Sequence, residues 1–291
     1  MSTTLLYVIL FVFGLIIGSF LNVVIFRYSP EENLFCLKRL RGRSKCMSCQ
    51  KQLKWYELIP LLSFVIQKRK CRGCAVKLSW QYFLVELASG LIFVFPAIFI
   101  KSVFIPATFV WLAGGLWILI MLSLLLVWLI DYRFYIIPDE LNVFLGILGA
   151  ALTYVEYHFH QFGTMMGSFI KNYAMLFGFR ENIWINHLFG VAVALVIVGL
   201  IILLTRGRGM GMGDLKLVLA LGLIFGWPDI LFVLIFAFIL GAILGIFLII
   251  RGIKGIKEAV PFGPLLVSGS LLVIFFGQTI LGGYFRIFNI F

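Results

Sequence analysis

The chain has 291 residues, of which 63% are hydrophobic and only 12% are charged. This balance lies far outside that of soluble globular domains and excludes a protein that is surrounded by water on all sides. A formal net charge of +12 is compatible with nucleic-acid binding, but the distribution of the basic residues fits a membrane topology better, so we expect no nucleic-acid partner.

Long apolar stretches predict the fold class. A bilayer core roughly 30 Å thick requires about 20 apolar residues for each helix that crosses it. We therefore predict an all-α polytopic membrane protein with about eight transmembrane helices, of which the sixth is the shortest. The predicted spans lie near residues 4–26, 82–100, 106–130, 137–156, 187–204, 215–226, 229–250 and 263–285.

The loop after the first span sets the predicted orientation. Thirteen of the 24 Lys and Arg residues lie between Arg27 and Lys77, together with three Glu residues. Positively charged loops stay on the cytoplasmic side, so this loop is predicted to be cytoplasmic and the N-terminus to lie outside. Alternation through eight spans then places Arg133, Arg206 and Arg251 on the cytoplasmic side as well.

The same loop contains all five cysteines, and four of them form two CxxC pairs: Cys46 with Cys49, and Cys71 with Cys74. This spacing is typical of a structural Zn²⁺ site, although the 21 residues between the pairs slightly exceed the usual range. Free thiols remain an alternative, and a disulfide pair is the poorer one in a reducing compartment. We expect a small zinc-ribbon-like loop whose metal has a structural role. Cys36 has no partner at a suitable spacing.

Asp131 follows the apolar run 106–130, where a helix reaches the cytoplasm. Asp214 follows a glycine-rich turn that contains Gly211 and Gly213, at the start of another helix. Ionisable groups are costly at membrane depth, so both are candidate functional residues. The predicted topology places both carboxylates on the same face of the membrane.

Two such carboxylates can share one proton, so that the ionised member activates water and the protonated member polarises a carbonyl group. That is the chemistry of an aspartyl protease. Taken singly, each residue has a simpler interpretation: Asp131 lies at a helix end, and Asp214 is an N-cap. The two sequence contexts taken together favour a catalytic role for both aspartates.

The order of motifs along the chain resembles the bacterial type IV prepilin peptidases, a family of GxGD aspartyl membrane proteases. The likeness covers nearly the whole chain and includes both CxxC pairs. Its other parts are Gly18-Ser19-Phe20-Leu21-Asn22, Val85-Glu86-Leu87, Asp131 with Ile137-Pro138-Asp139, Gly211-Met212-Gly213-Asp214-Leu215-Lys216, and Pro261-Phe262-Gly263-Pro264.

The resemblance implies that Asp131 and Asp214 are the catalytic pair of an aspartyl endopeptidase. It implies prepilin or pseudopilin substrates with a short basic leader, and an indirect link to pilus or type II secretion machinery. It also implies N-methylation of the new terminus with S-adenosylmethionine as the methyl donor. Membrane lipid is the remaining expected partner. The expected location is the bacterial cytoplasmic membrane, with the catalytic residues and the cysteine loop on the cytoplasmic side.

Several residues receive smaller predictions. Glu86 is a candidate for methyl transfer, or pairs with a neighbouring helix. Asn22 is expected to form a hydrogen bond between helices, and Gly14 and Gly18 to allow close helix packing. Supporting residues are predicted around the two aspartates. One of them, Asp139, follows Pro138 at the start of a helix, where a negative charge in the first turn is favourable. These supporting residues are Gly211, Gly213, Lys216 and Asp139.

We divide the chain into a first transmembrane helix (1–26), a basic loop with the zinc site (27–80) and a transmembrane peptidase core (81–291). Two other classes of function remain open. A transporter would use the acids to bind cations or relay protons, and a scaffold would use the cysteine loop to dock a partner. Neither explains the aspartates and the cysteines together.

Overall fold

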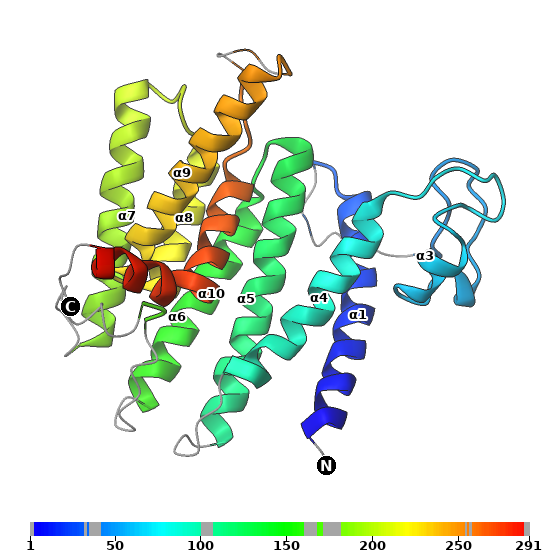
Figure 1. Ribbon diagram of the computed structural model, residues 1–291, viewed down its shortest axis with the longest axis horizontal. Coiled ribbons are helices and arrows are strands. Elements are labelled where there is room, and N and C mark those ends of the chain that lie inside the picture. Colours follow the sequence, from blue (N-terminus) through cyan, green and yellow to red (C-terminus); the bar gives the residue numbers. More distant parts are fainter. Residues whose placement is uncertain are drawn as a thin grey trace. The chain divides into compact units, whose positions relative to one another are not determined.

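The computed structural model describes residues 3–31, 34, 42–99, 107–159, 168–170, 182–253, 255 and 258–287. The long elements in these ranges are all helices (Figure 1). Within the same ranges, β-structure consists of two isolated bridges in the cysteine loop. The chain forms two compact units, Met1–Val103 and Phe104–Phe291, which are called unit 1 and unit 2 below.

Unit 1 is built on two long helices, α1 (Thr3–Arg27) and α4 (Trp80–Phe99), which lie side by side (Figure 1). Two short helices, η1 (Trp55–Glu57) and α3 (Leu62–Ile66), lie in the connection between them. A Cβ atom on Gly14 would lie 2.5 Å from the Ser89 carbonyl oxygen, and one on Gly18 would lie 2.8 Å from the Glu86 Cα. The glycines therefore allow α1 and α4 to approach closely, as predicted.

Unit 2 contains six helices in its described residues. A 14-residue helix, α8, packs against both α6 and α7, while α10 packs against α9 and α5. Leucine, isoleucine, valine and phenylalanine side chains of α8 are buried in these contacts. The helices are α5 (Ala107–Phe134), α6 (Asp139–Phe159), α7 (Ile183–Thr205), α8 (Met212–Phe225), α9 (Asp229–Ile250) and α10 (Gly263–Ile287).

Each of the eight predicted spans coincides with a helix, which confirms the prediction of an all-α polytopic membrane protein. Six helices of the described chain are long and apolar enough to cross a membrane: α1, α4, α5, α7, α9 and α10. The helix α8 is about 21 Å long at 1.5 Å per residue, which is shorter than a hydrocarbon core. The helix α6 is long enough but carries Asp139, Glu140 and Glu156.

The second predicted span, α4, packs in unit 1 with the first helix and the cysteine loop. The division into residues 1–26, 27–80 and 81–291 was based on function rather than on packing, and it stays a prediction.

Candidate active site and metal centre

Asp131 lies in the last turns of α5 and is only 4% exposed. The Gly263 backbone N–H group donates a hydrogen bond of 2.8 Å to its Oδ2 atom. Gly263 is the first residue of α10, and the first N–H groups of a helix have no partner inside their own helix. The start of α10 therefore supplies a donor that holds the buried carboxylate in place.

The contact with Asp131 also explains why residue 263 is a glycine. A Cβ atom at this position would lie 2.7 Å from Asp131 Oδ2 and 3.1 Å from its carboxyl carbon. A side chain here would displace the carboxylate. Gly263 has no predicted role beyond its place in the Pro261-Phe262-Gly263-Pro264 motif. The signal that could have identified it is a glycine directly before Pro264 at a helix start.

Asp214 lies in the first turn of α8, which begins at Met212 with Gly211 as its N-cap. The Gly211 backbone N–H group donates a hydrogen bond of 3.0 Å to Asp214 Oδ2. Asp214 is therefore not the N-cap itself, which was the simpler interpretation of its context. It reaches back to the N-cap as the third residue of a capping box does. A helix N-terminus favours a negative charge at this position.

Asp131 and Asp214 belong to two helices of unit 2, α5 and α8. Each carboxylate has one oxygen fixed by a backbone N–H group at the start of a helix. Two interacting carboxylates titrate as a pair and can hold one proton between them. The arrangement can therefore combine an ionised acid with a protonated one.

The supporting residues near Asp214 have specific contacts. Lys216 donates hydrogen bonds of 2.8 and 2.7 Å to the two carboxylate oxygens of Asp139, at the start of α6. Both side chains are well exposed, so the ion pair has little effect on stability. Gly213 faces Ile137, and a Cβ atom there would lie 3.5 Å from the Ile137 Cβ, which is ordinary contact. Lys216 thus links α8 to α6.

Other acids of unit 2 have partners that join helices and loops. Asp229 accepts hydrogen bonds from the Ser168 hydroxyl group (2.8 Å) and the Phe169 N–H group (2.7 Å). Glu156 lies 3.5 Å from His187 Nε2. These contacts tie α9 to residues 168–170 and α6 to α7, which is a structural role.

The four cysteines of the CxxC pairs come together in unit 1. Their Sγ atoms all lie within 4.8 Å of one another, and those of Cys46 and Cys74 are 3.9 Å apart. Four thiolates around Zn²⁺, with bonds of about 2.3 Å, lie about 3.8 Å apart in a tetrahedron. The donor set therefore fits a closed four-thiolate metal site. Cys36, which belongs to neither CxxC pair, lies outside the described residues.

The local backbone also suits metal binding. The N–H groups of Cys74 and Gly73 are directed at the Cys71 thiol and lower its pKa to about 6; the Gly73 nitrogen lies 3.3 Å from the sulfur. Thiolate is the form that binds metals. An isolated bridge closes each CxxC turn, between Lys45 and Gln52 and between Lys70 and Lys77.

Comparison with known protein families identifies both parts of the chain. Residues 12–100 match the bacterial peptidase A24 N-terminal domain, and residues 117–246 match the type IV leader peptidase family. The chain belongs to the type IV leader peptidase family. The second match contains Asp131 and Asp214, and the first contains Glu86 and the four clustered cysteines. The family resemblance read from the motifs is confirmed.

Relatives of this type IV leader peptidase are similar over most of its length. A prepilin leader peptidase/N-methyltransferase of Bacillus subtilis is 28% identical over 282 residues, covering 96% of this chain and 97% of the relative. One of Burkholderia pseudomallei is 29% identical, covering 94% and 87%. One of Myxococcus xanthus is 42% identical over 115 residues, about a third of each chain. No solved structure matches significantly. None of these relatives supports the transporter alternative.

Proposed function

We propose that Asp131 and Asp214 are the catalytic pair of this chain, which as a type IV leader peptidase removes the leader from prepilins and methylates the new N-terminus. The observation that supports this assignment is the pairing itself. Both carboxylates lie in unit 2, and each accepts a hydrogen bond from the N–H group of a glycine at a helix start. Asp229, the other buried acid of the described part of unit 2, instead accepts hydrogen bonds from the Ser168 hydroxyl group and the Phe169 N–H group.

The pair carries out hydrolysis by acid–base chemistry. The ionised carboxylate takes a proton from water, and the water oxygen attacks the scissile carbonyl carbon while the protonated carboxyl group donates to the carbonyl oxygen. When the C–N bond breaks, a proton passes to the leaving amine. The N–H groups of Gly263 and Gly211 fix one oxygen of each acid, so the other oxygens remain for water and substrate.

We place this chemistry on the cytoplasmic face of the inner membrane because of the charge of the cysteine loop, where thirteen Lys and Arg residues accompany three Glu residues. The substrate is a prepilin or pseudopilin whose basic leader stays on that side while its apolar helix lies in the lipid. Pilus or type II secretion machinery then receives the product.

Two further roles follow in unit 1. The cysteine cluster holds structural Zn²⁺, which would stabilise a loop with little core of its own. Glu86 serves methyl transfer from S-adenosylmethionine. It lies buried on α4, and its Oε2 atom accepts a hydrogen bond of 2.8 Å from the Leu61 N–H group of the loop.

The test uses purified full-length protein in detergent and a model prepilin, with the substrate mass as the readout. Asp131→Asn and Asp214→Asn are each expected to slow leader removal by roughly 10²- to 10⁴-fold. Glu258→Gln is the matched control, because this acid is exposed and lies in the same unit. Processing at the normal rate by either catalytic variant would sink the assignment.

A further inference from the structure

The cysteine loop of unit 1 exposes a group of large apolar side chains. They lie in residues 55–66, which contain η1 and α3 and belong to the stretch between the two CxxC pairs. Their exposed fractions run from 37% to 77%. Single apolar side chains on a surface are common, but a contiguous group marks an interaction site. The group, called the apolar face below, consists of Trp55, Ile59, Leu62, Val65 and Ile66.

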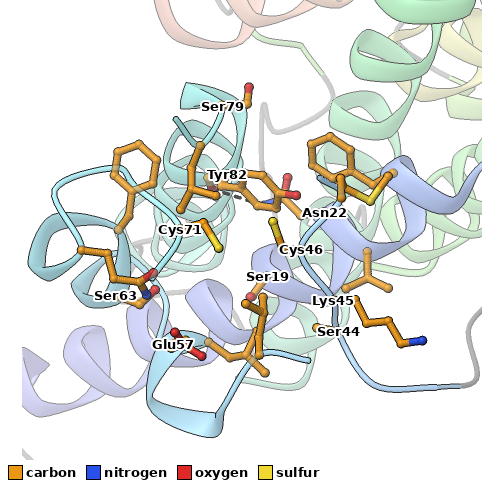
Figure 2. A pocket seen from close by; sticks show the side chains of 18 of the residues that line it. Ser19, Asn22, Ser44, Lys45, Cys46, Glu57, Ser63, Cys71, Ser79 and Tyr82 are labelled. Atoms are coloured by element: carbon orange, nitrogen blue, oxygen red, sulfur yellow. Dashed lines mark hydrogen bonds between the residues drawn. The ribbon is translucent and has the colours of Figure 1, made fainter. Parts of the chain in front are cut away.

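The other side of the same segment faces the interior of unit 1. A cavity of about 300 Å³ lies between α1, α4 and the cysteine loop, and Glu57, Ser63 and Phe64 line it. Figure 2 shows Glu57 and Ser63 at its wall. The residues of the apolar face do not line this cavity. In α3, Leu62 and Ile66 are four residues apart, so they share one side of the helix, roughly opposite Phe64. The apolar face therefore points away from the interior.

Contacts with α4 place the segment at the boundary of the membrane. The helix α4 is long and apolar enough to cross a membrane, and it begins at Trp80. The Phe64 ring packs against the rings of Trp80 and Phe83, at 5.4 and 5.6 Å between centroids. The Leu61 N–H group donates a hydrogen bond of 2.8 Å to Glu86, which lies about 9 Å along α4 at 1.5 Å per residue. The segment thus lies beside the first two turns of a membrane span, where headgroups meet hydrocarbon.

The charges of the loop fit an anionic lipid surface. Residues 42–79 contain nine Lys and Arg residues and a single acid, Glu57. Glu57 is buried and accepts a hydrogen bond of 2.8 Å from the Lys54 N–H group, so its charge is turned inward. Eight of the nine basic residues are exposed, and three of the nine, at positions 68–70, directly follow α3. Exposed basic residues attract anionic headgroups, and Trp is enriched at the membrane–water interface.

A protein partner fits the same surface less well. The substrate of the proposed function has a basic leader, which the positive charge of the loop would repel. The loop is also tethered at both ends to apolar helices, because α1 ends at Arg27 and α4 begins at Trp80. Lipid is therefore always within reach of the apolar face.

We propose that the apolar face docks on an anionic lipid bilayer, with its aromatic and aliphatic side chains among the headgroups and the exposed lysines on the lipid phosphates. Docking holds residues 55–66 against α4 and so keeps Glu57 and Ser63 at the cavity wall. This inference goes beyond the proposed function, because it depends neither on the aspartates nor on methyl transfer.

Cross-linking to lipid tests the docking directly. The full chain, with a photoreactive diazirine residue introduced at Val65, is reconstituted in nanodiscs of phosphatidylcholine with or without about one third phosphatidylglycerol. We expect lipid adducts at this position, with a yield roughly threefold or more higher when phosphatidylglycerol is present at low salt. The same residue introduced at Gln50, an exposed position outside the apolar face, is the matched control and should give little lipid adduct.

Hydrogen exchange of residues 55–66 measures the apolar contribution. In nanodiscs with phosphatidylglycerol, the combined variant Leu62→Gln and Ile66→Gln should exchange roughly tenfold faster than the wild type, because both side chains lose apolar contact with lipid. Unchanged zinc content would report that the loop is folded. The combined variant Lys68→Gln and Lys70→Gln should instead keep the lipid adduct at Val65 but lose its dependence on phosphatidylglycerol.

The outcomes separate lipid from other occupants of the apolar face. Adducts at Val65 that go mainly to residues 104–291, or to added prepilin, would overturn the proposal, since another part of this chain or the substrate would then cover the face. Equal lipid labelling at Val65 and Gln50, or wild-type exchange in the Leu62 and Ile66 variant, would also overturn it. Leader cleavage in detergent does not enter these readouts, so failure of the docking and failure of the peptidase assignment remain distinguishable.

Discussion

The two units place their acids in different surroundings. In unit 2, the Gly263 N–H group at the start of α10 holds Asp131, and the Gly211 N–H group at the N-cap of α8 holds Asp214. In unit 1, Glu57 and Glu86 line a cavity that the cysteine cluster helps to enclose. The first arrangement suits proton sharing, and the second suits a cationic ligand, because two buried acids need compensating positive charge. In the proposed function, bond cleavage therefore uses two acids of unit 2, and group transfer uses an acid of unit 1.

The largest expected effect comes from the catalytic pair. Asp214→Asn removes one of the two acids and should lower leader cleavage by roughly 10²- to 10⁴-fold, while binding of S-adenosylmethionine stays at the wild-type value. Mass spectrometry of the prepilin measures leader cleavage, and equilibrium dialysis of S-adenosylmethionine measures its binding, both on the same protein preparation. Loss of both activities together would argue against separate sites.

The next effect concerns the donor that positions Asp131. Gly263→Ala adds a methyl group 2.7 Å from Asp131 Oδ2 and should displace the carboxylate, lowering kcat for cleavage by up to roughly a hundredfold. KM should change less, because the substrate contacts are not altered. Gly283→Ala on the same helix is the control, since its Cβ atom would meet nothing within 4 Å. Equal kcat values for the two variants would contradict a positioning role.

Loss of the metal should affect unit 1 more than unit 2. Cys46→Ser removes a ligand that also lines the cavity, so zinc content should fall and methylation should slow by roughly tenfold, with a smaller change in cleavage. Metal analysis of the purified protein and the methyl mass on the product measure this. Absence of zinc from the folded wild-type protein would contradict the prediction of a zinc-ribbon-like loop.

The smallest expected effect is that of the exposed ion pair. Lys216→Met leaves Asp139 without its partner but does not touch either catalytic carboxylate. Exposed pairs contribute at most about 1 kcal/mol, so cleavage should change by less than about fivefold. A larger loss, seen as a shifted pH profile of kcat, would instead show that Lys216 acts on the aspartates.

Much of the fold could be predicted from apolar runs, because the thickness of the bilayer sets the length of a transmembrane helix. The same patterns located Asp131, Asp214 and the four cysteines, since acids and CxxC pairs are conspicuous in an apolar chain. The glycines at 14 and 18 indicated close packing of the first helix, and the structure shows that its partner is α4. What these patterns measure is local: span length, charge and spacing.

Long-range contacts could not be read in this way. The bond from Gly263 to Asp131 joins residues 132 positions apart, and nothing in either segment specifies its partner. Likewise, the cavity of unit 1 needs α1, α4 and the loop together, so Glu57 received no role although Glu86 did. The pairing of Lys216 with Asp139 depends on how α6 and α8 meet.

The central claim is that cleavage and methyl transfer use separate residues in separate units. The most direct measurement compares the wild type, Asp131→Asn and Glu86→Gln by product mass, with prepilin and with already cleaved pilin as substrates. We predict that Asp131→Asn leaves prepilin intact but methylates cleaved pilin, whereas Glu86→Gln removes the leader and adds little or no methyl mass. A single variant that abolishes both reactions on both substrates while remaining folded would contradict the account.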